Sequence, residues 1–139
     1  MDNEFDLERF VRAQAPVYAA VLDELRAGRK RSHWMWFIFP QIAGLGHSEM
    51  AQRYAIASAD EAAAYLAHPL LGARLRECAS IVASHDDRSA DEIFGHPDEL
   101  KFRSSMTLFA DVAPDEAVFQ DCIDKFFDGE ADDATLARL

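Results

Sequence analysis

The sequence is poor in the residues that build metal and redox sites. It contains two cysteines, Cys78 and Cys122, which lie far apart and lack the spacing of a zinc or disulfide-exchange motif. Its five histidines are scattered, with no pair at metal-ligand spacing. We therefore expect two buried, reduced thiols, no bound metal and no cofactor.

Long hydrophobic runs are also missing. The longest strongly apolar run, Trp34 to Pro40, is far shorter than the roughly 20 residues that a membrane-spanning helix needs. Residues 1–6 lack the basic and apolar regions of a signal peptide. We expect a cytoplasmic protein that does not associate with membranes.

Positive charge is scarce. The chain has 14 Lys and Arg against 25 Asp and Glu, which gives a formal net charge of −11 at pH 7. That charge repels the phosphates of a nucleic-acid duplex, so duplex binding is not expected. The 139 residues suffice for one domain, residues 1–139, that buries roughly two-thirds of its unfolded surface. We expect this domain to be a monomer.

The signatures of common enzyme classes are absent as well. The sequence has no Gly-x-Ser-x-Gly nucleophile turn and no Gly-Lys-Ser or Gly-Lys-Thr phosphate loop. These absences disfavour a serine hydrolase of the common type and an NTPase with a phosphate loop.

What the sequence does contain is a helical pattern of apolar residues. Over residues 7–25 they repeat at spacings of three and four, which makes one apolar face of a helix. Gly28 is a typical helix stop, and Ser58 and Ser89 each precede a glutamate by three residues, as in a capping box. We predict an all-α fold, a single multi-helical domain of about six to eight helices, with at most a short extended segment near residues 33–39.

Residues 29–39 combine cations and aromatic side chains. Three basic residues and His33 lead into four aromatic residues within six positions. The cations can offset a helix dipole, and the aromatic residues can fill the core. Alternatively, an indole beside cations can stack on the ring of a ligand. For that role we favour Trp34 over Trp36, because Trp34 is nearer to His33, and we expect Trp36, Phe37 and Phe39 to be core residues.

A glycine-rich turn follows at Gly44, Gly46 and Ser48, just before a predicted helix. Glycines allow a sharp turn, and a helix start presents unpaired N–H groups that suit a phosphate. An ordinary tight turn has the same sequence. Together with the cations and the aromatic residues, however, this turn indicates a site for a nucleotide-like ligand.

Two further groups are candidates for the same site. Glu49 lies in the first turn of the predicted helix, where it can offset the dipole or, in an enzyme, orient water and stabilise an oxocarbenium-like centre. Lys101 and Ser105 are four residues apart on another predicted helix, so they share a face. That face either completes the pocket or is simply solvated.

Several segments resemble one protein family, the bacterial domain-of-unknown-function family 1810. The resemblance extends from about Phe10 to Leu136 and is most specific in its central run. The segments that carry it are Lys30-Arg-Ser-His-Trp-Met-Trp-Phe-Ile-Phe-Pro-Gln41, Gly44-Leu-Gly46, Tyr54-Ala-Ile56, Tyr65-Leu-Ala-His-Pro69, Ile93-Phe-Gly95 and Lys101-Phe-Arg-Ser-Ser-Met-Thr-Leu-Phe109.

More distantly, the helical layout resembles the NADAR proteins, also called YbiA-like. These are small helical N-glycosidases that act on ADP-ribose-like nucleotide conjugates. Their site resembles a Ser-Glu pair that opens a helix, and Ser48-Glu49 followed by Tyr54 is similar. The resemblance implies a YbiA-like fold and a catalytic role for Glu49.

Three hypotheses follow. The first is a domain that binds an ADP-ribose-type nucleotide and acts on it as an N-glycosidase-like hydrolase. The second is a non-catalytic module for a nucleotide or another phosphorylated ligand. The third is a protein-interaction domain, which requires an exposed patch over residues 34–39 with no concave pocket beside it. The predicted ligand-binding residues are Lys30, Arg31, His33, Trp34, Gly44, Gly46, Ser48, Lys101 and Ser105, with Glu49 as the catalytic candidate.

Overall fold

Several helices begin and end at the predicted cap residues. Ser89 and Glu92 form a complete capping box, since the Ser89 hydroxyl accepts from the Glu92 N–H at 3.1 Å and the Glu92 carboxylate accepts from the Ser89 N–H at 2.8 Å. Gly28 ends its helix in the left-handed conformation with φ +72°. Local sequence therefore sets these boundaries.

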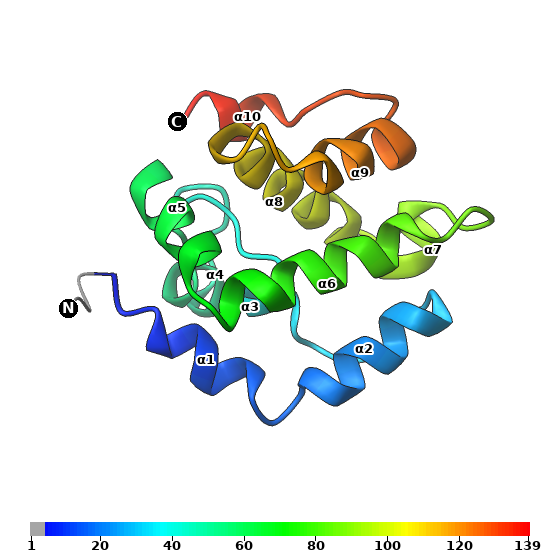
Figure 1. Cartoon of the computed structure of the whole chain (residues 1–139), viewed down its shortest axis with the longest axis horizontal. Coiled ribbons are helices and arrows are strands. Elements are labelled where there is room, and N and C mark those ends of the chain that lie inside the picture. The colour runs from blue at the N-terminus through cyan, green and yellow to red at the C-terminus, as the bar shows by residue number, and fades with distance from the viewer. Residues whose placement is uncertain (1–4) are drawn as a thin grey trace.

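The computed structural model describes residues 5–139, and this part of the chain is all-α and forms a single domain (Figure 1). Its fold class was therefore predicted correctly. The helices number more than the expected six to eight, in part because a short helix, α3 (Met35–Ile38), forms in the aromatic segment, whereas α4 (Glu49–Arg53) is the helix predicted to follow Ser48. The ten helices are α1 (Glu8–Gln14), α2 (Tyr18–Ala27), α3 (Met35–Ile38), α4 (Glu49–Arg53), α5 (Ala59–Ala67), α6 (Leu71–Ala83), α7 (Ala90–Phe94), α8 (Asp98–Val112), α9 (Ala117–Phe127) and α10 (Asp133–Leu136).

Residues 35–38 of the segment near 33–39 form the short helix α3, and no strand forms there, which agrees with the prediction of at most a short extended piece. In α3, the N–H groups of Ile38 and Phe39 donate to the carbonyl oxygens of Trp34 and Met35, both at 3.1 Å. All of residues 34–39 except Trp36 are buried, and a helical turn satisfies its own backbone groups without a partner strand. Within residues 5–139 the only strand-like pairing is a parallel bridge between Ile42 and Ile56.

The long helix α6 crosses the middle of the molecule, with α1 and α2 on one side and α8, α9 and α10 on the other (Figure 1). Aromatic residues from several elements meet in the core. The Phe102 ring lies 5.0 Å from that of Phe39 and 4.6 Å from that of Phe94, measured between ring centroids. Both cysteines are buried free thiols, as expected, and burial raises the pKa of each to about 12.

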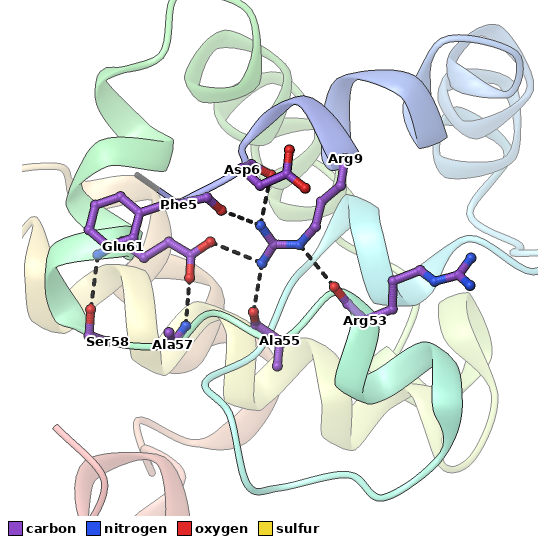
Figure 2. A network of polar contacts seen from close by, with 8 residues as sticks. All are labelled: Phe5, Asp6, Arg9, Arg53, Ala55, Ala57, Ser58 and Glu61. Carbon is purple, nitrogen blue, oxygen red and sulfur yellow. Dashed lines mark hydrogen bonds and ion pairs between the residues drawn. The ribbon is translucent and has the colours of Figure 1, made fainter. Parts of the chain in front are cut away.

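Arg9 joins α1 to the segment between α4 and α5 (Figure 2). Its guanidinium donates to the carbonyl oxygens of Arg53 and Ala55, both at 2.9 Å, and to the Glu61 carboxylate, also at 2.9 Å. Glu61 is 2% exposed and accepts a further bond from the Ala57 N–H at 2.7 Å. We call this set of contacts the Arg9 clamp. It fixes the C-terminal end of α4 and the segment that leads from α4 into α5.

Candidate functional site

Trp34, which the sequence analysis predicted to bind a ligand, lies in the core. It is 1% exposed, and its indole N–H donates to the Glu24 carboxylate at 2.9 Å. Glu24 also accepts from the backbone N–H groups of Arg31 and Ser32, at 2.7 and 3.0 Å, and from the Ser32 hydroxyl at 2.6 Å. Partial burial acts to raise the pKa of Glu24, but these hydrogen bonds outweigh it and lower the pKa to about 2.

This position corrects the choice of Trp34 over Trp36 as the stacking residue. A buried indole N–H needs an acceptor, and Glu24 supplies one to Trp34. Trp36 is the half-buried tryptophan, so its expected core role is wrong, whereas Phe37 and Phe39 are buried as predicted. An exposed patch over residues 34–39, which the protein-interaction hypothesis requires, is not present, since Trp36 alone in this range is not buried.

Trp36 lines two neighbouring hollows that share Gln41, Gly46 and Ala51; together we call them the Trp36 groove. Their volumes are about 140 and 410 Å³. The smaller hollow is lined by Trp36, Gln41, Ile42, Ala43, Gly44, Gly46, Ala51, Gln52, Tyr54 and Ala55. The larger is lined by Trp36, Gln41, Leu45, Gly46, His47, Ser48, Ala51, Pro97, Leu100, Lys101, Ser104, Asp132 and Ala134.

The glycine turn forms one wall of the groove. Gly46 is required there by close packing, because a Cβ atom at this position would lie 2.7 Å from the Ala51 side chain. Gly44 has φ +99°, and its carbonyl oxygen accepts from Arg138 Nη2 at 3.1 Å. Ser48 caps α4, since its hydroxyl accepts from the Ala51 N–H at 3.1 Å.

Besides Gln41, His47 and Ser48, the larger hollow has polar side chains from α8 and from Asp132, the residue that caps α10. Lys101 Nζ lies 5.3 Å from the centroid of the Trp36 ring and 3.3 Å from Asp98 Oδ1. The Ser104 hydroxyl donates to Asp132 Oδ2 at 3.0 Å, and the Thr135 N–H donates to the same oxygen at 3.1 Å. The groove therefore places a cation beside an aromatic face, with a hydroxyl and a carboxylate nearby.

The structure brings some predicted residues together and separates others. Gly44, Gly46, Ser48 and Lys101 line the groove. Lys30 does not line it but is linked to Lys101, because both lysines contact Asp98; the Lys30 Nζ to Asp98 Oδ2 distance is 2.9 Å.

The remaining predicted residues lie outside the groove. Arg31, His33 and Glu49 are exposed and line neither hollow. For Arg31 the cause is the Glu24 carboxylate, which holds the backbone of residues 31 and 32 at the end of α2. Ser105 is fully buried, and its hydroxyl makes no hydrogen bond within residues 5–139.

Sequence reasoning missed several groove residues. Gln41 lines both hollows. It could have been predicted, since it is a polar residue shortly after the aromatic run. Asp132 could not be predicted, because it is 28 residues from Ser104 and meets it only through the packing of α10 on α8. Tyr54 lines the smaller hollow and packs its ring 5.3 Å from that of Phe37.

Within residues 5–139, no three His, Cys, Asp or Glu side chains are grouped so that they could hold a metal ion. The same part of the chain has no helix with the length and apolar character needed to span a membrane. Its fold and groove define a small all-α domain with a concave site large enough for a small organic molecule.

The chain belongs to the family described as "Protein of unknown function (DUF1810)", whose model matches residues 4–139. It is similar to the conserved hypothetical protein Rv1873 from Mycobacterium tuberculosis, known from a crystal structure. The two chains are 56% identical and superpose with a TM-score of 0.96 over 97% of this chain and 96% of that one. No curated protein matches the chain.

Proposed function

We propose that this protein binds a nucleotide-like ligand in the Trp36 groove. A planar ring would pack against Trp36, and a phosphate would contact Lys101 and the turn at Gly46 and Ser48. The observation that carries this proposal is the position of Lys101 Nζ, 5.3 Å from the Trp36 ring centroid, at a hollow that the glycine turn also lines.

The exposure of Trp36 supports the proposal. A tryptophan that is only half-buried beside a concave surface offers a ring face at small conformational cost, and stacking on such a face is tolerant of the kind of ring. The larger hollow, at about 410 Å³, is within the range of small-molecule sites.

The charges beside the groove also support the binding of an anionic group. The net charge of −11 repels phosphate in general, so binding requires a local positive field. Lys30 and Lys101 share a single partner, Asp98, and this group of three carries a net positive charge next to the groove. Asp132 opposes this field, which favours phosphate contacts near Lys101 over contacts near Asp132.

The test is a titration with ADP-ribose followed by NMR. We expect saturable shifts of the Trp36 indole signal and of the Gly44 and Gly46 amides. The Trp34 indole is an internal control, since it is buried against Glu24. No shift of the Trp36 indole at about 5 mM ligand would contradict the proposal, because that concentration detects even millimolar affinity.

Variants distinguish binding in the groove from binding to the surrounding surface. Trp36→Ala removes the stacking face and should weaken binding by about tenfold or more. Lys101→Gln removes the cation and should weaken binding of ADP-ribose more than binding of adenosine, which lacks phosphate. Arg31→Gln is the matched control for charge, because Arg31 is exposed outside the groove. Equal losses in Lys101→Gln and Arg31→Gln would show a general charge effect instead.

Hydrolysis of an N-glycosidic bond in such a ligand is the second candidate function. Its support is the likeness of Ser48-Glu49 to the Ser-Glu pair of the NADAR enzymes, with Ser48 in the lining of the groove and Glu49 exposed beside it. Chromatography of ADP-ribose conjugates incubated with the protein would detect a released base or ribose. Glu49→Gln should abolish turnover and leave binding intact; turnover lost instead in Asp132→Asn would assign the reaction to the carboxylate that lines the groove.

A further inference from the structure

A second cleft lies between α1 and the C-terminal end of α4. Its volume is about 470 Å³, and its lining residues are Asp6, Arg9, Arg12, Ala13, Arg53 and Tyr54. Three arginines thus line one cleft in a chain where acidic residues outnumber basic ones by 25 to 14. We call it the arginine cleft.

The Arg9 clamp explains why the arginines meet. Arg9 and Arg12 are three residues apart on α1, so their side chains leave the helix on the same face. Arg9 Nε donates to the carbonyl oxygen of Arg53 and thereby holds the end of α4 against α1. In Figure 2 the Arg53 side chain extends away from the Arg9 guanidinium, and only its backbone takes part in the clamp.

The three arginines have different roles. Arg9 donates through Nε and one terminal nitrogen within the clamp and through the other terminal nitrogen to the carbonyl oxygens of Phe5 and Asp6. The Glu61 carboxylate offsets its charge, so Arg9 positions the cleft. Arg12 and Arg53 are exposed, and within residues 5–139 their guanidinium groups make no hydrogen bond or ion pair. Their charges face the cleft with Asp6 as the acidic residue that lines it.

We propose that the arginine cleft binds a phosphate group through Arg12 and Arg53. A guanidinium presents parallel N–H donors that match the oxygens of a phosphate, and such charge-assisted bonds are among the stronger hydrogen bonds in proteins. Tyr54 also lines the cleft, and its buried ring packs against those of Phe10 and Phe37. Asp6 lowers the affinity by like-charge repulsion.

The experiment titrates the full chain with inorganic phosphate and, separately, with phenyl phosphate, in chloride buffer. The readout is the set of arginine Nε–Hε signals together with the Tyr54 amide. We expect saturable shifts at Arg12 and Arg53. Tighter binding of phenyl phosphate would identify a phosphate ester as the source, and tighter binding of inorganic phosphate would identify the free ion; either result supports a phosphate site.

Four variants test which side chains bind the phosphate and which oppose it. Arg12→Gln and Arg53→Gln should each weaken phosphate binding by about tenfold. Asp6→Asn should strengthen it by about twofold, since it removes the opposing charge at an exposed position. Arg26→Gln, which removes an exposed charge from α2, should leave the affinity unchanged.

Two outcomes would overturn the proposal. One is the absence of saturable shifts at Arg12 and Arg53 at about 20 mM phosphate, a concentration well above a millimolar dissociation constant. The other is an equal loss of affinity in Arg26→Gln, which would indicate a general charge effect. The proposed function of the Trp36 groove is tested separately. Its readout is the Trp36 indole signal, and binding of ADP-ribose there should be unchanged in Arg12→Gln and Arg53→Gln.

Discussion

Glu24 shows how one side chain decides which residues are available for binding. Its carboxylate accepts hydrogen bonds from Arg31, Ser32 and Trp34, so it fixes the chain as it leaves α2 and keeps the Trp34 indole in the core. Bonds to an ionised carboxylate are stronger than those between neutral groups. The burial of Trp34, and with it the exposure of Trp36, therefore depends on a residue ten positions earlier.

The Glu24 charge also makes the stability of the fold depend on pH. The pKa of Glu24 in the folded state, about 2, is below the ordinary value of 4.5, so its stabilisation is fully present above pH 4.5 and is lost as the pH falls toward 2. We expect Glu24→Gln to lower the free energy of unfolding at pH 7 by about 1–2 kcal/mol, a value reduced for solvent screening at this partly exposed site.

Urea unfolding at pH 7 and at pH 3 measures this difference. The gap between Glu24→Gln and the parent should narrow at the lower pH, because the parent then loses part of the same contribution. Asp23→Asn removes a neighbouring exposed carboxylate and should change stability little at either pH. A gap that stays constant or widens as the pH falls would disprove the assigned role of the Glu24 charge.

At the scale of elements, the glycine turn and α4 fit together through Gly46 and Ala51. A Cβ at residue 46 would lie 2.7 Å from the Ala51 Cβ, so an alanine there forces the turn away from α4. Both residues line the two hollows of the Trp36 groove. The shape of the groove therefore depends on this single close approach.

Gly46→Ala should lower the free energy of unfolding by about 1–3 kcal/mol through overpacking. Ala51→Gly removes the opposing methyl group and should itself cost about 1 kcal/mol, because glycine is unfavourable within a helix. The double variant should be more stable than the sum of the two changes predicts, since the clash is absent. Chemical denaturation of the four proteins measures this coupling, and strict additivity would show that the two side chains do not compete for space.

The Arg9 clamp acts between elements in a similar way. It holds α1, the end of α4 and the start of α5 together through contacts to backbone carbonyls and to the buried Glu61. Arg9 and Glu61 are 52 residues apart, so no local sequence signal links them. Both the Trp36 groove and the arginine cleft contain residues that this clamp positions, since Ala55 lines the groove and Arg53 lines the cleft.

At the scale of the whole molecule, the net charge of −11 produces repulsion that opposes folding. Raising sodium chloride from about 0.02 to 0.5 M shortens the Debye length and screens this repulsion. We expect the midpoint of thermal unfolding to rise by about 2–4 °C over that range. A fall in the midpoint would mean that surface ion pairs such as Lys125–Asp86 contribute more than the net charge removes.

Much of the fold was predictable because its signals are local. The spacing of apolar residues indicates helices, Gly28 and the Ser89–Glu92 pair define helix ends, and two isolated cysteines without motif spacing indicate buried thiols. The position of the candidate site was predictable in part for the same reason. The glycine turn is local, and Gly44, Gly46 and Ser48 do line the groove.

The sequence by itself thus determined the helical class, several helix boundaries and the segment around which the groove forms. Tertiary structure alone decided which tryptophan faces the groove, because the acceptor for the Trp34 indole is on another element. It also decided that Asp132 joins Ser104 and that Arg53 lies beside α1. The physical reason is that helix propensity and capping act within about one turn, whereas these contacts follow from how helices distant in the sequence pack together.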